Sequence, residues 1–342
     1  MNRKRELLVL APGSILDPSG QQLEILLAGL DRHRFERRAW LPGPGALSER
    51  LEAAAVELDF APGLAPRASK RDSVAASSRV LLGRRCDLVQ AEGWRPALVA
   101  LPRRIARGGK LIWVLRRPPL GRAEARALER LGVRPDRIVA AGAARAADFP
   151  PRWQERVVRI EDAIEIPERA ASPAWRPADE LLIGPASPES ELDLNQMLLH
   201  ALRILAGELP ALRLAVAGPG VFRRAVELQT AALGLSQKLR SVAAADEVAI
   251  AVVDAAAAPL NLARALACGI PTVAVGGELP DSVAINVARR DLDGLVSALR
   301  ALAREPARAD TLASAGRAYA AAELGPARRV QRFEQLYDQL LS

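Results

Sequence analysis

An arginine interrupts an apolar stretch near the end of the chain, PLNLARALACGIPTVAV, Pro259 to Val275. The pattern predicts an apolar helix, a Cys-Gly stop and a strand that opens with proline. The first turn, which contains Leu260 and Asn261, offers free N–H groups and the positive end of the helix dipole to a phosphate. Arg264 adds a guanidinium that can hold an anion through two hydrogen bonds. These residue types predict anion binding at this helix.

Two further places carry residues suited to phosphate. Arg116 and Arg117 follow the apolar run KLIWVL, and an arginine there can hold an anion but cannot shuttle a proton, because it stays charged at any working pH. Solvated loop arginines are the alternative. Gly218 and Gly220 form a Gly-x-Gly at the end of another apolar run, a pattern that many strand-to-helix turns share.

Metal and cysteine chemistry are disfavoured. The chain has two cysteines, Cys86 and Cys268, and two histidines, His33 and His200, which are too few and too scattered for a zinc site or a disulfide framework. His200 lies on an apolar helical stripe, where a buried, hydrogen-bonded histidine is the usual case. We therefore expect neither a metal nor a cofactor.

Short apolar runs that favour strands alternate with longer segments of helical period, which is typical of a parallel α/β architecture. In the first half the predicted strands are 6–12, 37–42, 56–60, 87–92, 110–116, 136–141 and 156–160, with helices at 19–31 and 95–109. In the second half the predicted strands are 180–186, 212–217, 248–255 and 271–275, with helices at 193–210, 221–235, 259–268 and 327–342.

The two series predict two domains of an α/β protein. The stretch 167–180, PERAASPAWRPADE, has three prolines and no periodicity, so we expect a linker there. The expected organisation is an N-terminal Rossmann-like domain at 1–166, the linker at 167–180, a C-terminal Rossmann-like domain at 181–325 and a closing helix at 326–342.

The formal charge of +8 at pH 7 is unevenly distributed. Residues 1–160 carry 30 Lys and Arg against 17 Asp and Glu, a net charge of +13, whereas residues 161–342 carry a net charge of −5. Arginine suits phosphate and carboxylate groups, but aromatic residues make up only 4 % of the chain, so surfaces for base stacking are scarce. We expect contact with an anionic membrane surface or an acidic acceptor, and not with nucleic acid. A solvated Ala/Arg-rich surface without a partner is the alternative.

The sequence has no run of about 18 uncharged apolar residues, and its start, MNRKRELLVLAPG, passes from basic residues directly into a short predicted strand. We therefore expect a cytoplasmic protein that is at most peripheral at the inner face of the cell membrane.

The order of four segments carries a family resemblance. They are SGQQLEILLAGLDRHRFERRAWLPG (19–43), LRLAVAGPG with VELQTAALGL (212–235), PLNLARALACGIPTVAV (259–275) and RRVQRFEQLYDQLL (328–341). Together they resemble the retaining, glycogen-synthase-like group of bacterial glycosyltransferases. The resemblance implies the GT-B architecture, in which two Rossmann-like domains face one cleft. It also implies a nucleotide-sugar donor and a glycan, lipid or small-molecule acceptor.

The resemblance also assigns places to site residues. Ser19-Gly20 stands where the group has a Gly-rich loop whose N–H groups approach the donor pyrophosphate, with a plain helix N-cap as the alternative. Arg116 stands where the group has a polar residue, commonly histidine, that faces the transferred sugar. Pro185 and Ser190 stand where the group has an Arg and Lys pair that neutralises the leaving diphosphate.

Two glutamates of the group, eight positions apart, fall here on Ala256 and Arg264. Asp254, two residues before the first of these positions, is the candidate to substitute for a glutamate. The group's Asn-Gly turn and the acid after it correspond to Asp162-Ala163 and Glu165. The parts that define the fold therefore match, whereas the donor site is largely replaced.

Two hypotheses about function follow. The first is a retaining glycosyltransferase in which Arg116 and Arg264 replace the missing cations. The second is a catalytically inactive GT-B scaffold that binds a partner enzyme, a glycan or an anionic membrane surface. A dehydrogenase is disfavoured, because APGSILDPSG (11–20) lacks the Gly-x-Gly-x-x-Gly of a dinucleotide site.

Overall fold

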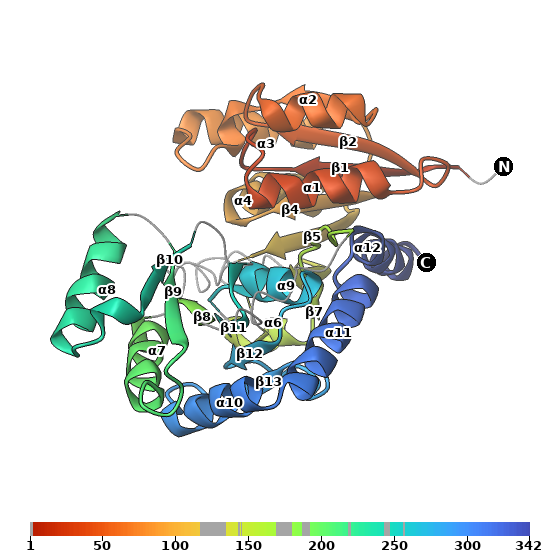
Figure 1. The fold of residues 1–342 in the computed structure, drawn as a ribbon. Coiled ribbons are helices and arrows are strands. Elements are labelled where there is room, and N and C mark those ends of the chain that lie inside the picture. The colour runs from red at the N-terminus through yellow and green to blue at the C-terminus, as the bar shows by residue number, and fades with distance from the viewer. Residues whose placement is uncertain are drawn as a thin grey trace. The chain divides into compact units, whose positions relative to one another are not determined.

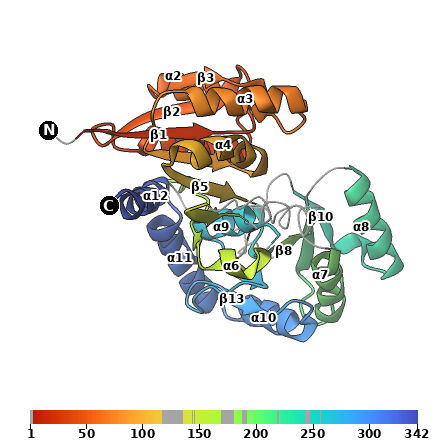
Figure 2. The same ribbon diagram turned by 180° about the vertical axis from the view of Figure 1, so that it is seen from behind.

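The computed structural model describes residues 3–116, 135–142, 144, 146–168, 180–186, 192–217, 220–242, 247–255 and 257–342. The chain forms two compact units. Unit 1 consists of Met1–Ala163 and Pro326–Ser342, and unit 2 consists of Ile164–Gly325. Each unit is built on a parallel sheet with helices packed on both of its faces (Figures 1 and 2).

The sheet of unit 1 has the strand order β3-β2-β1-β4-β5-β6-β7, and every pair of neighbours is parallel. Its strands are β1 (Arg5–Leu10), β2 (Phe35–Leu41), β3 (Glu57–Phe60), β4 (Leu88–Glu92), β5 (Lys110–Leu115), β6 (Arg137–Ala140) and β7 (Val157–Arg159). The apolar runs predict these strands because each is buried between two helical layers.

The helices of unit 1 cover two separate apolar cores. Its helices are α1 (Pro18–Gly29), α2 (Ala46–Ala53), α3 (Lys70–Leu82), α4 (Trp94–Arg107), α6 (Pro151–Gln154) and α12 (Pro326–Leu341), with short 3₁₀ turns η1 (Pro62–Leu64) and η2 (Ala146–Asp148). Leu7 and Val9 of β1 pack on α1, α2 and α12, whereas Leu8 and Leu10 pack on α3 and α4. The period of two along β1 thus sends alternate side chains to opposite cores.

Three tryptophans pack edge to face in the second of these cores. Trp113 is fully buried, and its ring centroid lies 5.9 Å from that of Trp94 and 5.5 Å from that of Trp153.

The sheet of unit 2 has the order β10-β9-β8-β11-β12-β13 and is also parallel. Its strands are β8 (Leu181–Ala186), β9 (Leu212–Val216), β10 (Leu239–Ser241), β11 (Ile250–Asp254), β12 (Thr272–Val275) and β13 (Ile285–Val287). Its helices are α7 (Leu192–Leu205), α8 (Gly220–Ala232), α9 (Pro259–Ala267), α10 (Leu292–Arg304) and α11 (Pro306–Glu323), with the 3₁₀ turn η3 (Ser236–Lys238).

The predicted fold class, two Rossmann-like α/β domains, is confirmed by these two sheets. The predicted closing helix is α12, which packs against α1 and β2 of unit 1, and Phe35 meets Tyr337 at a ring-centroid distance of 5.7 Å. Most of the predicted linker, residues 169–179, lies outside the described residues.

Candidate functional site

Parallel sheets bind ligands where the strand order reverses, at the carboxyl ends of the strands. In unit 2 this switch point lies between β8 and β11, which are neighbours in the sheet although β9 and β10 come between them in sequence. The chain leaves β11 at Asp254 and enters α9 at Pro259. The helix singled out by its arginine therefore begins at the switch point.

Asp254 holds the loop between β11 and α9. Its side chain is 4 % exposed, and its Oδ1 accepts a hydrogen bond of 2.9 Å from the Ala257 N–H. Its backbone carbonyl accepts a further bond of 2.9 Å from the Ala258 N–H. The Arg289 Nη2 lies 3.6 Å from the same Oδ1, so the buried carboxylate has a cationic neighbour. Asp254 thus fixes where α9 starts.

The N-terminus of α9 has no side-chain cap. The residue at the N-cap is Ala258, which has no polar side-chain atom, and Pro259 occupies the first helical position, where its missing N–H costs nothing. Leu260 and Asn261 are half-buried in this first turn. No residue of this first turn is acidic, but the buried carboxylate of Asp254 lies just before it. The Asn261 N–H donates to the Ala258 carbonyl at 3.0 Å, so the expectation that it is free is wrong.

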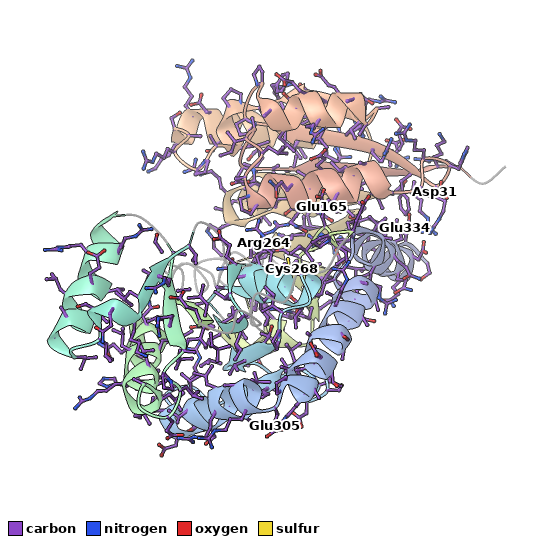
Figure 3. All side chains as sticks on the ribbon, in the orientation of Figure 1. Asp31, Glu165, Arg264, Cys268, Glu305 and Glu334 are labelled. Atoms are coloured by element: carbon purple, nitrogen blue, oxygen red, sulfur yellow. The ribbon has the colours of Figure 1, made fainter. Side chains whose placement is uncertain are left out.

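Arg264 lies one and a half turns into α9 and is exposed (Figure 3). Within the described part of the chain no carboxylate forms an ion pair with it. Because Cα–Cβ bonds in a helix tilt toward its N-terminus, a side chain at position 264 is able to reach back along α9 toward the first turn. The axial separation from Pro259 is about 7.5 Å, which an arginine side chain can span.

Four positions singled out in the sequence, Gly218, Ala256, Ser190 and Arg117, lie outside the described residues, as does the segment 187–191.

In unit 1, Gly20 lies in the first turn of α1. Its N–H donates to the Asp17 Oδ1 at 2.8 Å, so Asp17 caps this helix. A Cβ at this position would come within 2.3 Å of the Ile15 carbonyl oxygen. The glycine lets the loop between β1 and α1 fold closely onto its own helix.

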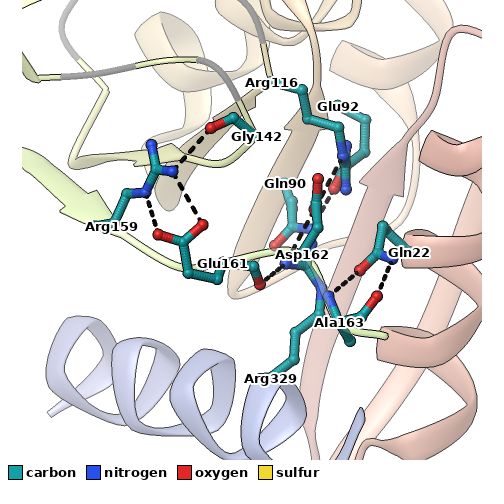
Figure 4. Close-up of polar contacts among 10 residues, drawn as sticks. All are labelled: Gln22, Gln90, Glu92, Arg116, Gly142, Arg159, Glu161, Asp162, Ala163 and Arg329. Carbon is teal, nitrogen blue, oxygen red and sulfur yellow. Dashed lines mark hydrogen bonds and ion pairs between the residues drawn. The ribbon is translucent and has the colours of Figure 1, made fainter. Parts of the chain in front are cut away.

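Arg116 follows β5 and is held by two carboxylates from neighbouring elements (Figure 4). Its Nη1 lies 2.7 Å from the Oε2 of Glu92, the last residue of β4, and its Nε lies 3.3 Å from the Oδ1 of Asp162. Both carboxylate side chains are 6 % exposed. Arg116 is therefore a partner of buried acids at the carboxyl edge of unit 1.

A second arginine completes this buried cluster from α12. The Arg329 Nη1 lies 3.3 Å from the Asp162 Oδ1 and donates to the Glu161 carbonyl at 2.6 Å. On the same helix the Tyr337 hydroxyl donates to Gln90, whose amide in turn donates to Glu92 at 2.7 Å. We call Glu92, Arg116, Asp162 and Arg329 the buried ion cluster. Its two guanidinium groups balance its two carboxylates.

The pKa shifts in and beside the cluster follow from burial and neighbouring charge. Burial lowers the pKa of Arg329 to about 10, helped by the charge of Arg116. For Arg116 burial opposes the charged form, but Glu92 and Asp162 outweigh it and raise its pKa above the ordinary value. Burial, with the charge of Glu92, raises the pKa of Tyr337 well above its usual range. At neutral pH both arginines are charged and Tyr337 is neutral.

The turn after β7 is fastened to α1 as well. The Ala163 N–H donates to the Gln22 Oε1 at 2.7 Å, and the Gln22 amide donates to the Ala163 carbonyl at 2.8 Å. Glu165 is exposed and lies in unit 2.

Of the two predicted anion-binding arginines, one is therefore paired and the other is open to solvent. They lie in different units, Arg116 in unit 1 and Arg264 in unit 2. The sequence pattern did not identify Glu92 or Arg329 as residues of this edge. Glu92 could have been found, because it ends a predicted strand next to the one that Arg116 follows.

No protein-family model and no curated protein sequence matches the chain. Solved structures do match over nearly its whole length. HepE from Anabaena, in complex with UDP and glucose, aligns with a TM-score of 0.72 at 16 % identity, covering 98 % of this chain and 99 % of that one. A glycosyltransferase from Rickettsia africae gives a TM-score of 0.74 at 11 % identity, with both chains fully covered. The lipopolysaccharide outer core galactosyltransferase WaaB gives 0.71 at 10 % identity, covering 98 % of this chain and all of that one.

The chain has the fold of GT-B glycosyltransferases. The fold expected from the sequence resemblance is therefore confirmed. Among the residues that the structure describes, no helix is long and apolar enough to cross a membrane. The same residues contain no group of three or more His, Cys, Asp or Glu side chains placed to hold a metal ion.

Proposed function

We propose that the chain transfers a sugar, with retention, from a nucleotide-sugar to an envelope lipid, a polysaccharide or another acceptor, and that the donor diphosphate binds unit 2 at the start of α9. The observation that carries this proposal is the pairing of an uncapped helix N-terminus with the exposed Arg264 at the switch point of the sheet. Such a place attracts phosphate through the helix dipole and a guanidinium.

The reaction requires a site that stabilises negative charge as the glycosidic bond breaks. Electrons from the bond between the anomeric carbon and oxygen pass to the diphosphate, whose charge increases in the transition state. Arg264 and the Leu260 and Asn261 end of α9 supply the opposing positive charge. Asp254 acts as a positioning residue that holds the loop from which α9 starts.

The solved structures support this assignment. HepE has been solved in complex with UDP and with UDP-glucose, and its fold matches this chain from end to end. In the proposal, residues 181–325 form the donor-side domain, residues 1–166 the acceptor-side domain and residues 167–180 the linker. The net charge of +13 on residues 1–160 supports binding of an acidic acceptor, or activity at the inner face of an anionic membrane.

A nucleotide-release assay with a panel of UDP-, GDP- and ADP-sugars tests the proposal. We expect release above background with at least one donor, and a loss of about tenfold or more in kcat/KM for Arg264→Ala, since a charge-assisted hydrogen bond contributes about 1.5–3 kcal/mol. Release that is absent with every donor, or equal in the variant, would contradict it.

A second candidate is the inactive GT-B scaffold that binds a partner enzyme, a glycan or an anionic membrane surface. The ion pairs of Arg116 with Glu92 and Asp162 favour it, because an arginine held by two acids is not available to a leaving diphosphate. The stretch 183–194 also holds no Lys or Arg and two glutamates, Glu189 and Glu191. This candidate predicts that no nucleotide-sugar binds.

A further inference from the structure

A cavity of about 680 Å³ opens at the amino edge of the unit 1 sheet. It lies where β1, β4 and β5 begin and where α4 and α12 end, so it is at the opposite end of the strands from the buried ion cluster. The two ends of the described chain, near Arg3 and Leu341, both line it. In both ribbon views the ends of the chain lie on the same side (Figures 1 and 2). We call it the basic cavity.

Its wall carries an excess of positive charge. Five cationic side chains line it, namely Arg3, Arg85, Arg103, Arg107 and Lys110, against one side-chain carboxylate, Asp87. Asp87 is already engaged, since its Oδ2 accepts the Glu6 N–H at 2.8 Å and its Oδ1 lies 3.8 Å from Arg3.

Arg3 is paired, since its Nη2 lies 3.4 Å from the Glu6 carboxylate and 3.8 Å from that of Asp87. The other four cations are not neutralised in this way. Arg103 is 3 % exposed, and its guanidinium donates to the neutral carbonyls of Val80 and Arg84, at 2.8 and 2.9 Å. Over the described ranges, no carboxylate forms an ion pair with Arg85, Arg107 or Lys110. A buried guanidinium with only dipolar partners is costly unless an anion lies nearby.

The negative ends of two helices neutralise only part of this positive charge. The C-terminal ends of α3 and α4 lie beside these arginines, and each end carries about half a negative charge. With Arg3 paired, the four other cations face two helix ends and the terminal carboxylate of Ser342, which also lines the cavity, and a surplus of about two positive charges remains. That surplus suits a phosphate group.

We propose that the basic cavity binds the phosphate group of a phosphorylated ligand. Its volume lies within the range of about 300–1,000 Å³ that is usual for small-molecule sites, so the ligand extends beyond a single phosphate. Leu340 and Leu341 give the cavity an apolar side for the rest of that ligand. This site is separate from the donor site proposed on unit 2, and it stands or falls independently of it.

Cys86 provides a local reporter. It is half-buried in the cavity wall, and burial raises the pKa of its thiol. The chain's other cysteine, Cys268, is buried in unit 2. A ligand in the basic cavity should therefore slow alkylation of Cys86 by iodoacetamide, followed by mass spectrometry of the peptide that contains it.

The first arm of the test uses inorganic pyrophosphate and the full chain. We expect pyrophosphate to protect Cys86, with a half-protecting concentration that rises about tenfold or more in Arg85→Ala and in Lys110→Ala. Arg85 is exposed and Lys110 half-buried, so neither substitution removes a core contact. The matched control is Arg71→Ala, which removes the same charge from the exposed surface of α3 outside the cavity and should leave protection unchanged.

The second arm separates a free ligand from a lipid headgroup. Vesicles of phosphatidylcholine, with and without phosphatidic acid, replace pyrophosphate in the same assay. Protection by pyrophosphate supports a free phosphorylated ligand, and protection only by vesicles with phosphatidic acid supports a lipid phosphate. Protection by neither overturns the proposal, as does a response in which Arg71→Ala weakens protection as much as Arg85→Ala.

Discussion

Arg329 carries a positive charge from α12 into the interior of unit 1, where its side chain is 2 % exposed. Its contact with Asp162 lets the buried ion cluster reach electrical balance, and it ties the last helix of the chain to the turn after β7. Arg116 pairs with Asp162 and Glu92 in the same cluster, so its role in unit 1 is structural.

Arg329→Met should therefore destabilise unit 1 strongly. The substitution leaves two buried carboxylates with one guanidinium, and breaking a buried pair in this way costs about 3–5 kcal/mol. The measurement is the free energy of unfolding in urea. Tryptophan fluorescence reports on unit 1, because four of the five tryptophans, Trp40, Trp94, Trp113 and Trp153, belong to it.

The control is Arg50→Met, which breaks the 3.3 Å surface pair with Glu24, where the arginine side chain is 62 % exposed. An exposed pair contributes about 0–1 kcal/mol. Equal losses in the two variants would show that the cluster does not act as a buried network.

The raised pKa of Tyr337 predicts a pH dependence at alkaline pH. In the unfolded chain a tyrosine ionises near pH 10, whereas in the folded protein burial keeps Tyr337 protonated to higher pH. At Tyr337 the folded state then binds more protons than the unfolded state, so the contribution of this residue to stability is lost as pH rises above about 10.

Comparison with Tyr337→Phe isolates this effect. Below about pH 9 the wild type should be more stable by a constant amount, because its hydroxyl donates to Gln90. Above about pH 10 the difference should shrink, by up to about 1.4 kcal/mol for each pH unit. A difference that stays constant up to pH 11 would contradict the assignment.

The partners of Arg116 illustrate what the sequence cannot provide at the scale of residues. Glu92 is 24 positions away and Asp162 is 46 positions away, and Arg329 joins from the far end of the chain. Residue types and spacing identified Arg116 as a strong anion ligand. They could not show that the anions it binds are carboxylates of its own chain.

At the scale of elements, the strands were predicted where an apolar run is long and bounded by turn residues. β10 and β13 were not predicted, because a polar residue stands among the three residues of each, LRS and INV. β7 has the same length but was predicted, because VVRI surrounds it with apolar residues. α3 escaped because its two buried side chains, Ala76 and Val80, leave no apolar stripe to detect. α10 could have been found, since Asp291 caps it and Leu295, Leu299 and Leu302 lie on one face.

Gly13, in the loop after β1, and Gly20, in the first turn of α1, allow a comparison of the same substitution at an open and a crowded position. A Cβ on Gly20 would lie 2.3 Å from the Ile15 carbonyl oxygen, whereas a Cβ on Gly13 would meet nothing within 4 Å. Gly20→Ala should lower the free energy of unfolding by about 1–3 kcal/mol through strain. Gly13→Ala should change it by less than about 1 kcal/mol. Equal effects would mean that the loop can move away from α1 at no cost.

At the scale of the whole molecule, the repeated α/β pattern predicted both sheets, and the solved structures confirm the GT-B fold. The uneven distribution of charge along the chain is also a property of the whole molecule. The net charge of +13 on residues 1–160 includes all five cations of the basic cavity, whereas the proposed donor site lies in the acidic second half. A site for an anionic ligand in that half therefore depends on a few groups, above all Arg264 and the N-terminal end of α9.

Calorimetric titration of the full chain with UDP tests this dependence most directly. The account predicts saturable binding that Arg264→Ala weakens by about tenfold or more and that Arg71→Ala leaves unchanged. Arg85→Ala, measured in parallel, shows how much of the binding the basic cavity contributes, because this substitution weakens that cavity and leaves α9 unchanged. The absence of saturable binding, or the same affinity in Arg264→Ala as in the wild type, would contradict the account.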